Sequence, residues 1–132
     1  MSATLQRTTE TNRVSEDAAR SGEIARRQAL YRDVNEQIRL IAENVELEDH
    51  LDFVCECANC SFDRLILTRQ DYDAIRRFPT RFLVKPGHDA RDEERVVEES
   101  AGYAVVEKVG AGAQIAIQLD SRRKDGRPRR ST

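Results

Sequence analysis

The sequence predicts an α+β fold, in which an N-terminal amphipathic helix precedes a small mixed α/β domain with a short, mostly antiparallel sheet. Two features carry this prediction. Apolar residues recur at helical spacing up to about residue 45, and from Leu51 onward they alternate with period two. The length of 132 residues corresponds to one domain with tails rather than to two full cores.

The first segment, residues 1–20, is rich in Thr, Ser, Arg and Glu and contains few apolar side chains. Such a segment buries too little surface to offset the entropy of ordering, so we expect a disordered N-terminal arm. The chain contains no run of eighteen apolar residues and does not begin with an apolar leader. We therefore expect no membrane span, no secretory signal and a cytoplasmic location.

The amphipathic helix is expected over residues 21–46. Ser21 can cap its start, and Glu23 lies in the first turn, where the helix dipole favours a negative charge. The helix should be held by packing of its apolar stripe on the following domain. In the alternative, residues 24–45 pair with a second copy to form a homodimer. The stripe consists of Ile24, Tyr31, Val34, Ile38, Ile41 and Val45.

The small domain is expected over residues 51–119. Thr68 resembles a helix N-cap with Asp71 three residues later, and the helix that it opens should end before Pro79. Residues 110–112, Gly-Ala-Gly, are expected to form a turn between the last two strands. The expected strands are residues 51–55, 64–68, 81–84, 96–97, 103–107 and 115–119.

All three cysteines, Cys55, Cys57 and Cys60, fall within six residues. An odd, crowded set in a chain without secretory features favours a metal over a disulfide framework, and sulfur ligands favour zinc. His88 is the preferred fourth ligand, because Pro86 and Gly87 form a rigid turn that presents it at a fixed angle. The alternatives for the fourth position are His50, water, or a carboxylate such as Glu56.

Zinc also fits the size of the domain. About seventy residues with few aromatic side chains commonly need a staple, so we predict one structural zinc ion per chain. Three other uses of the cysteines remain open. Cys57 and Cys60 form a C-x-x-C pair that suits redox chemistry, the set resembles part of an iron–sulfur or copper site, and the thiols can also be free.

The charge of the chain is unevenly distributed. From residue 121 onward, six basic residues oppose Asp125, giving +5, so the other residues carry −7 of the total of −2. Residues 120–132 are therefore expected to form a basic disordered tail, which solvates the chain, folds back on the acidic domain or contacts the phosphates of a nucleic acid. The basic residues are Arg122, Arg123, Lys124, Arg127, Arg129 and Arg130.

Several segments resemble a family of small, uncharacterised bacterial proteins with an F-x-C-E-C…C, P-G-H and Y-x-V-V-E-K pattern. The resemblance covers about residues 35–108, and here the pattern occupies residues 53–60, 86–88 and 103–108. In the family, the third cysteine usually lies four residues beyond C-x-C, whereas here only Ala58 and Asn59 intervene. The cysteine spacing is also similar to the post-SET zinc motif of histone methyltransferases. The resemblance implies a shared fold and a zinc site, and it implies no enzymatic activity.

These observations predict a non-enzymatic, zinc-stabilised protein-interaction or regulatory module whose partner is a protein. No Ser/His/Asp set or other catalytic constellation is recognisable in the sequence. One alternative is a nucleic-acid-binding protein that uses the Arg122–Arg130 tail. The other alternative is a thiol-based redox sensor.

Overall fold

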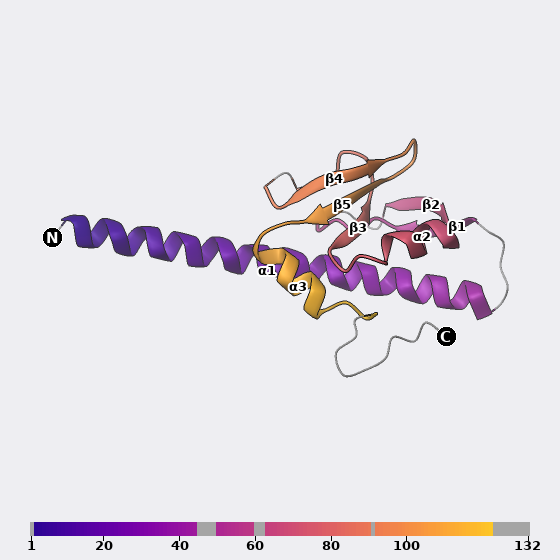
Figure 1. Cartoon of the computed structure of the whole chain (residues 1–132), viewed down its shortest axis with the longest axis horizontal. Helices are drawn as coiled ribbons and strands as arrows, with labels where there is room; N and C mark the ends of the chain where they lie inside the picture. Colours follow the sequence, from indigo (N-terminus) through magenta and orange to yellow (C-terminus); the bar gives the residue numbers. More distant parts are fainter. Residues whose placement is uncertain (1, 45–49, 60–62, 91, 123–132) are drawn as a thin grey trace.

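The computed structural model describes residues 2–44, 50–59, 63–90 and 92–122 (Figure 1). It contains three helices and two small antiparallel sheets in this part of the chain, which confirms the α+β class. Residues 123–132, and with them most of the predicted tail, lie outside the described residues. The elements in chain order are α1 (Ser2–Asn44), β1 (His50–Val54), β2 (Arg64–Thr68), α2 (Arg69–Ile75), β3 (Arg81–Val84), β4 (Glu94–Glu99), β5 (Ala104–Lys108) and α3 (Ala111–Gln118).

Helix α1 is much longer than the sequence predicted. It begins at Ser2 rather than near Ser21, so the expectation of a disordered arm over residues 1–20 was wrong. The arm extends beyond the rest of the fold, while the second half of α1 runs alongside it (Figure 1). Nucleating a helix is costly but extending one is not, so packing of the second half makes it easier to continue the helix through a polar segment. No described helix is both long enough and apolar enough to cross a membrane.

The strands form one hairpin and one three-stranded sheet. Strand β1 pairs with β2, and Leu51 lies opposite Leu67. In the second sheet, the order is β3-β5-β4, with β5 between its two antiparallel neighbours. The chain after β1 joins the two sheets, because the Glu56 N–H donates to the Leu83 carbonyl at 2.7 Å. This bond brings the cysteine segment beside β3.

The apolar core lies between the sheets, α2 and α1. Phe53 stacks on Tyr72 with ring centroids 4.4 Å apart, and this contact ties β1 to α2. The predicted N-cap is confirmed, since Thr68 accepts a hydrogen bond from the Asp71 N–H at 3.0 Å. The fully buried apolar side chains include Phe53, Leu67, Tyr72, Phe82, Leu83, Val84, Val105 and Val106.

The last predicted strand, residues 115–119, is instead part of α3, so this prediction and the predicted hairpin turn were wrong. Gly110 forms the N-cap of α3 with φ of +77°, a backbone conformation that glycine adopts at little cost. The buried residues of the helix are Gly112 and Ala116, which lie four apart and therefore on one helical face. An ideal Cβ at Gly112 would meet the Ala25 Cβ at 3.6 Å, so this small-residue face lies against α1. The alternation of Ile115, Ile117 and Leu119 suggested a strand. In the helix, these larger side chains lie to either side of the Gly112–Ala116 face that contacts α1.

The face of α1 that packs on the domain is offset from the predicted apolar stripe, because Ile38 packs against the core from a partly buried position. Ile41, a member of that stripe, is 59% exposed, and Leu30 is 60% exposed. The buried positions still recur at helical spacing, but small and polar residues occupy them. They are Gly22, Ala25, Gln28, Ala29, Arg32, Asn35, Glu36 and Ala42. Small side chains let the backbones approach, and the polar ones find hydrogen-bond partners across the interface.

Candidate metal centre

Three potential metal ligands, Cys55, Cys57 and His88, come together at the end of β1. One ligand atom from each lies within 4.8 Å of the other two, and no other such group occurs among the described residues. We call these three side chains the Cys–His cluster. It joins residues that are more than thirty positions apart in the chain, so the fold itself assembles it.

The two cysteines occupy alternate positions in the segment that leaves β1. Both are buried, with 0% and 5% exposure for Cys55 and Cys57. In extended chain, alternate side chains point to the same side, whereas the intervening Glu56 points to the other. This local geometry places two sulfurs toward His88 and one carboxylate into the core.

His88 is held by the turn that the sequence predicted. The His88 N–H donates to the Lys85 carbonyl at 2.9 Å, and Gly87 has φ of +87°. Proline at the second position and glycine with positive φ at the third are typical of a type II turn. Because the turn directly follows β3, it fixes where the imidazole approaches the cysteines.

The distances within the cluster match those around a tetrahedral zinc ion. His88 Nδ1 lies 3.7 Å from Cys55 Sγ and 3.5 Å from Cys57 Sγ. Bond lengths near 2.3 Å to sulfur and 2.0–2.1 Å to nitrogen at tetrahedral angles separate the ligand atoms by about 3.6 Å. One ring nitrogen has either a single proton or a single lone pair, so it cannot make a full hydrogen bond to both sulfurs. A cation bound by all three groups would account for both contacts.

A backbone donor also points at the cluster. The Lys85 N–H lies 3.1 Å from Cys55 Sγ, within hydrogen-bonding distance of a sulfur acceptor. Such a bond stabilises a thiolate more than a neutral thiol, because hydrogen bonds to a charged acceptor are stronger. Donors of this kind commonly orient and tune the ligands of metal sites.

Glu56 supports the cluster from the opposite side, a role that the sequence did not indicate. Its carboxylate is fully buried and accepts from the Asn35 side chain at 2.8 Å, the Tyr72 hydroxyl at 2.7 Å and the Leu83 N–H at 2.9 Å. These bonds fix the backbone between the two cysteines. With both oxygens engaged in the core, Glu56 does not serve as the carboxylate ligand considered above.

The ionisation of Glu56 reflects two opposing effects. Burial raises the pKa of its carboxyl, and the hydrogen bonds from Asn35, Leu83 and Tyr72 partly lower it, leaving the pKa above its usual value. Burial and the nearby Glu56 carboxylate also hold the pKa of Tyr72 well above its usual value. The phenol therefore remains a hydrogen-bond donor to Glu56.

Asn35 connects this arrangement to α1. Its side-chain amide donates to the Val54 carbonyl at 2.8 Å and accepts from the Val54 N–H at 2.8 Å. The sequence offered one signal of this contact. Asn35 is a polar residue in the middle of a helix that was expected to bury apolar side chains. Buried amides need partners, so this position indicated a specific polar contact rather than a solvated face.

Three of the four predicted ligands lie in the described part of the chain. The structure brings Cys55, Cys57 and His88 together, while Cys60 lies outside the described residues. His50, the other histidine, is exposed at the first position of β1, opposite Thr68, and is not part of the cluster. The preference for His88 over His50 is therefore consistent with the geometry.

Of the basic residues proposed as a phosphate-binding tail, Arg122 lies in the described part of the chain. Its guanidinium contacts Glu36 at 2.6 Å and Asp73 at 3.0 Å, and its side chain is 19% exposed. Arg122 is thus an internal link between α1 and α2. The other five, Arg123, Lys124, Arg127, Arg129 and Arg130, lie outside the described residues.

No protein-family model, curated protein or solved structure matches this chain. The resemblance to the small bacterial family therefore stays a prediction, and we infer the function from the geometry of the Cys–His cluster and its surroundings.

Proposed function

We propose that this chain is a non-enzymatic protein-interaction module whose fold is stabilised by one zinc ion. The single observation that carries the metal part is the approach of Cys55 Sγ and Cys57 Sγ to the same nitrogen of His88, at 3.7 and 3.5 Å. Cys60 follows Cys57 by three positions in the sequence and is our proposed fourth ligand. Three cysteines and one histidine are a ligand set typical of structural zinc sites.

The surroundings of the cluster support a structural rather than a catalytic metal. Both described cysteines are buried, and the segment between them is bonded to β3, α1 and α2 through Glu56. Binding of the metal would therefore favour the same backbone geometry that the core requires. In such sites, the free energy of metal binding contributes to the free energy of folding.

Helix α1 supports the interaction part of the proposal. Its first half extends beyond the rest of the fold (Figure 1), and Leu30 and Ile41 are exposed on its second half. A helical segment that extends beyond its own domain gains little from packing on it, so a partner could stabilise it. That partner is another protein in our proposal, and a second copy of the chain is the alternative that light scattering would reveal.

The metal site is tested by elemental analysis of the purified protein, for which we expect one zinc ion per chain. His50→Ala is the matched control for His88→Ala, because both remove an imidazole and only His88 belongs to the cluster. Structural zinc binds with about 10–16 kcal/mol shared among four ligands, so His88→Ala should weaken binding roughly a hundredfold or more. Equal zinc affinity of the two variants would contradict the site.

Chelation and alkylation separate a structural site from a redox sensor. We expect EDTA to lower the melting temperature, and the zinc-loaded thiols to react slowly with iodoacetamide. Cys57→Ser should destabilise the region from Leu51 onward. Fast alkylation of loaded protein, with unchanged stability after chelation, would reject the structural role.

A further inference from the structure

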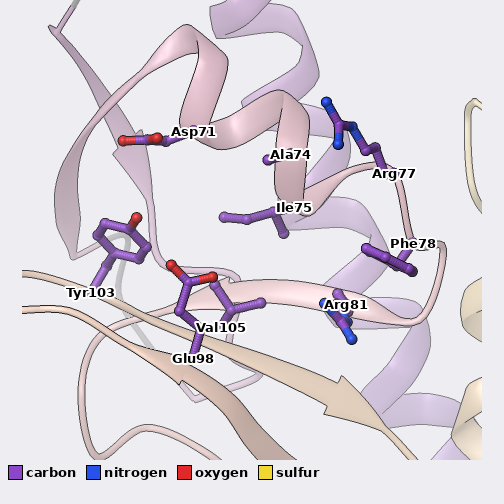
Figure 2. Close-up of a pocket in the computed structure, with 9 residues that line it drawn as sticks. All are labelled: Asp71, Ala74, Ile75, Arg77, Phe78, Arg81, Glu98, Tyr103 and Val105. Carbon is purple, nitrogen blue, oxygen red and sulfur yellow. The ribbon is translucent and has the colours of Figure 1, made fainter.

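A pocket of about 210 Å³ lies between α2 and strands β4 and β5. It contains none of the residues of the Cys–His cluster. Pockets for cofactor-sized ligands usually measure about 300–1,000 Å³, so this pocket suits one long side chain better than a cofactor. Figure 2 shows the side chains that line it.

One end of the pocket is acidic. Asp71 from α2 and Glu98 from β4 lie near Tyr103, whose hydroxyl is between the two carboxylates in the view of Figure 2. Within the described part of the chain, neither carboxylate has a side-chain hydrogen bond or an ion pair. Two carboxylates and a phenol oxygen are thus available as acceptors around one space.

A β-bulge in β4 places Glu98 at this end. The register changes between Val96, which lies opposite Val106, and Glu98, which lies opposite Val105. Without the extra residue, Val97 would be the partner of Val105, and an apolar side chain would occupy this position. Bulges often reorient a side chain beside a functional site, and this one places a carboxylate next to the pocket.

The rest of the pocket has a matching shape and charge. Ile75 and Val105, which are 5% and 2% exposed, provide an apolar wall for a methylene chain. Arg81 at the opposite end is already engaged, since it contacts Glu107 at 2.9 Å and stacks over Phe78. Arg77 adds a positive charge to that end, which disfavours a ligand with several adjacent basic residues.

We propose that this pocket binds an arginine side chain of a partner protein, presented in an extended segment. The guanidinium would lie between Asp71 and Glu98, beside the ring of Tyr103, and its methylene groups would pack on Ile75 and Val105. A planar guanidinium can bond two carboxylates and also stack on an aromatic ring, which an ammonium group does less well. The inference deepens the proposed interaction role by specifying the chemistry of the partner, and it does not require the metal site.

The test is an NMR titration of the ¹⁵N-labelled full chain, whose zinc content is measured beforehand. The probe is the peptide acetyl-Gly-Arg-Gly-amide, compared with the same peptide containing citrulline, a neutral analogue of arginine. We expect saturable shift changes at the amides of Asp71, Glu98 and Tyr103 with the arginine peptide alone. Glu98→Gln should raise the dissociation constant by about tenfold, because a charge-assisted hydrogen bond is lost.

Glu99→Gln is the matched control, because Glu99 is the adjacent exposed carboxylate on the same strand and does not line the pocket. It should leave the affinity unchanged. Equal binding of the citrulline peptide, absence of shifts around the pocket, or equal effects of the two substitutions would overturn the proposal. These failures differ from a failure of the metal site, which would appear in the zinc content and not in the peptide titration.

Discussion

The interface between the sheets and α2 is apolar, whereas the interface between α1 and the rest of the chain is largely polar. On the sheet side, Phe53, Phe82 and Val106 are fully buried. On α1, the fully buried side chains include Arg32 and Asn35. The first interface tolerates many apolar combinations of similar volume, while the second requires specific partners at specific positions.

The polar interface is organised around charged groups that share partners. Arg76 contacts both Glu36 and Asp120, and Arg122 contacts Glu36 from the C-terminal side. Arg32 donates to the Pro79 and Ala116 carbonyls at 2.8 and 2.9 Å. Helices α1, α2 and α3 are therefore joined through side chains whose removal would deprive buried carboxylates or carbonyl groups of a partner.

The largest effect is expected from Arg76→Met, which tests how much the polar interface depends on one guanidinium. Arg76 is fully buried, and its substitution removes the positive charge that pairs with the buried Glu36 and Asp120 carboxylates. Removing one partner of a buried ion pair typically costs about 3–5 kcal/mol, similar to Phe82→Ala in the apolar core. Urea denaturation measures both. Arg77→Met is the exposed control, and a comparable loss there would show that the effect is not specific to the buried pair.

A smaller effect is expected from Asn35→Ala, which breaks the polar interface at the Cys–His cluster. The substitution removes hydrogen bonds to both backbone groups of Val54 and to the Glu56 carboxylate. Leaving buried groups unpaired should lower the free energy of unfolding by about 1–3 kcal/mol. Hydrogen exchange of the Val54 amide should also accelerate. Gln37→Ala, at an exposed position of the same helix, should change neither quantity.

Acid should weaken the polar interface before the apolar one. Burial opposes ionisation of Asp120, but attraction to Arg76 and hydrogen bonds from Arg76 and the Arg122 N–H lower its pKa below the usual value. Partial burial also opposes ionisation of Asp73, but hydrogen bonds from Arg39 and Arg122 lower the pKa of its carboxyl below the usual value. A lowered carboxyl pKa adds stability above the unfolded-state pKa, and this stability is lost as the pH falls through the folded-state pKa.

The carboxamide variant Asp120→Asn measures this contribution. Its free energy of unfolding should be lower than that of the native sequence at pH 7, and the difference should shrink as the pH falls below about 4, where Asp120 begins to protonate in the unfolded chain. Glu56 and Asp33 act in the opposite direction, because burial raises the pKa of each. Glu56 and Asp33 are present in both the native protein and Asp120→Asn, so the difference between the two at each pH cancels the contribution of these residues. A pH-independent difference would show that the Asp120 charge does not stabilise the fold.

The smallest effect is expected on the outer surface. Arg64 and Asp52 form a 3.7 Å ion pair across β1 and β2, with both side chains more than half exposed. Solvent screening makes such pairs worth less than about 1 kcal/mol, so Arg64→Ala should leave the urea midpoint nearly unchanged. A loss as large as that of Arg76→Met would remove the distinction between buried and surface charges.

The sequence predicted the apolar half of the fold well and the polar half poorly. Alternation and turn residues located β1, β2 and β3, the Thr68 cap and the turn that carries His88, because these signals are local. Arg32 and Glu36 gave no such signal, and Asn35 indicated only that a polar partner existed, since the partners of all three are distant in the chain. In the candidate metal site, residue chemistry and turn geometry predicted Cys55, Cys57 and His88. The supporting role of Glu56 could not be predicted, because it depends on tertiary contacts with Asn35, Tyr72 and Leu83.

The two hydrogen bonds between the Asn35 side chain and the Val54 backbone have a consequence for self-association. In an antiparallel hairpin, the backbone groups of alternate residues point away from the paired strand and can recruit a further strand from another molecule. At Val54, the amide of Asn35 occupies both of these groups. A helical side chain thus occupies the outward-facing backbone groups at this end of β1, where another β-strand could otherwise pair. Detaching α1 would free these groups and the Glu56 carboxylate together, so the helix that anchors the domain also limits strand addition at Val54.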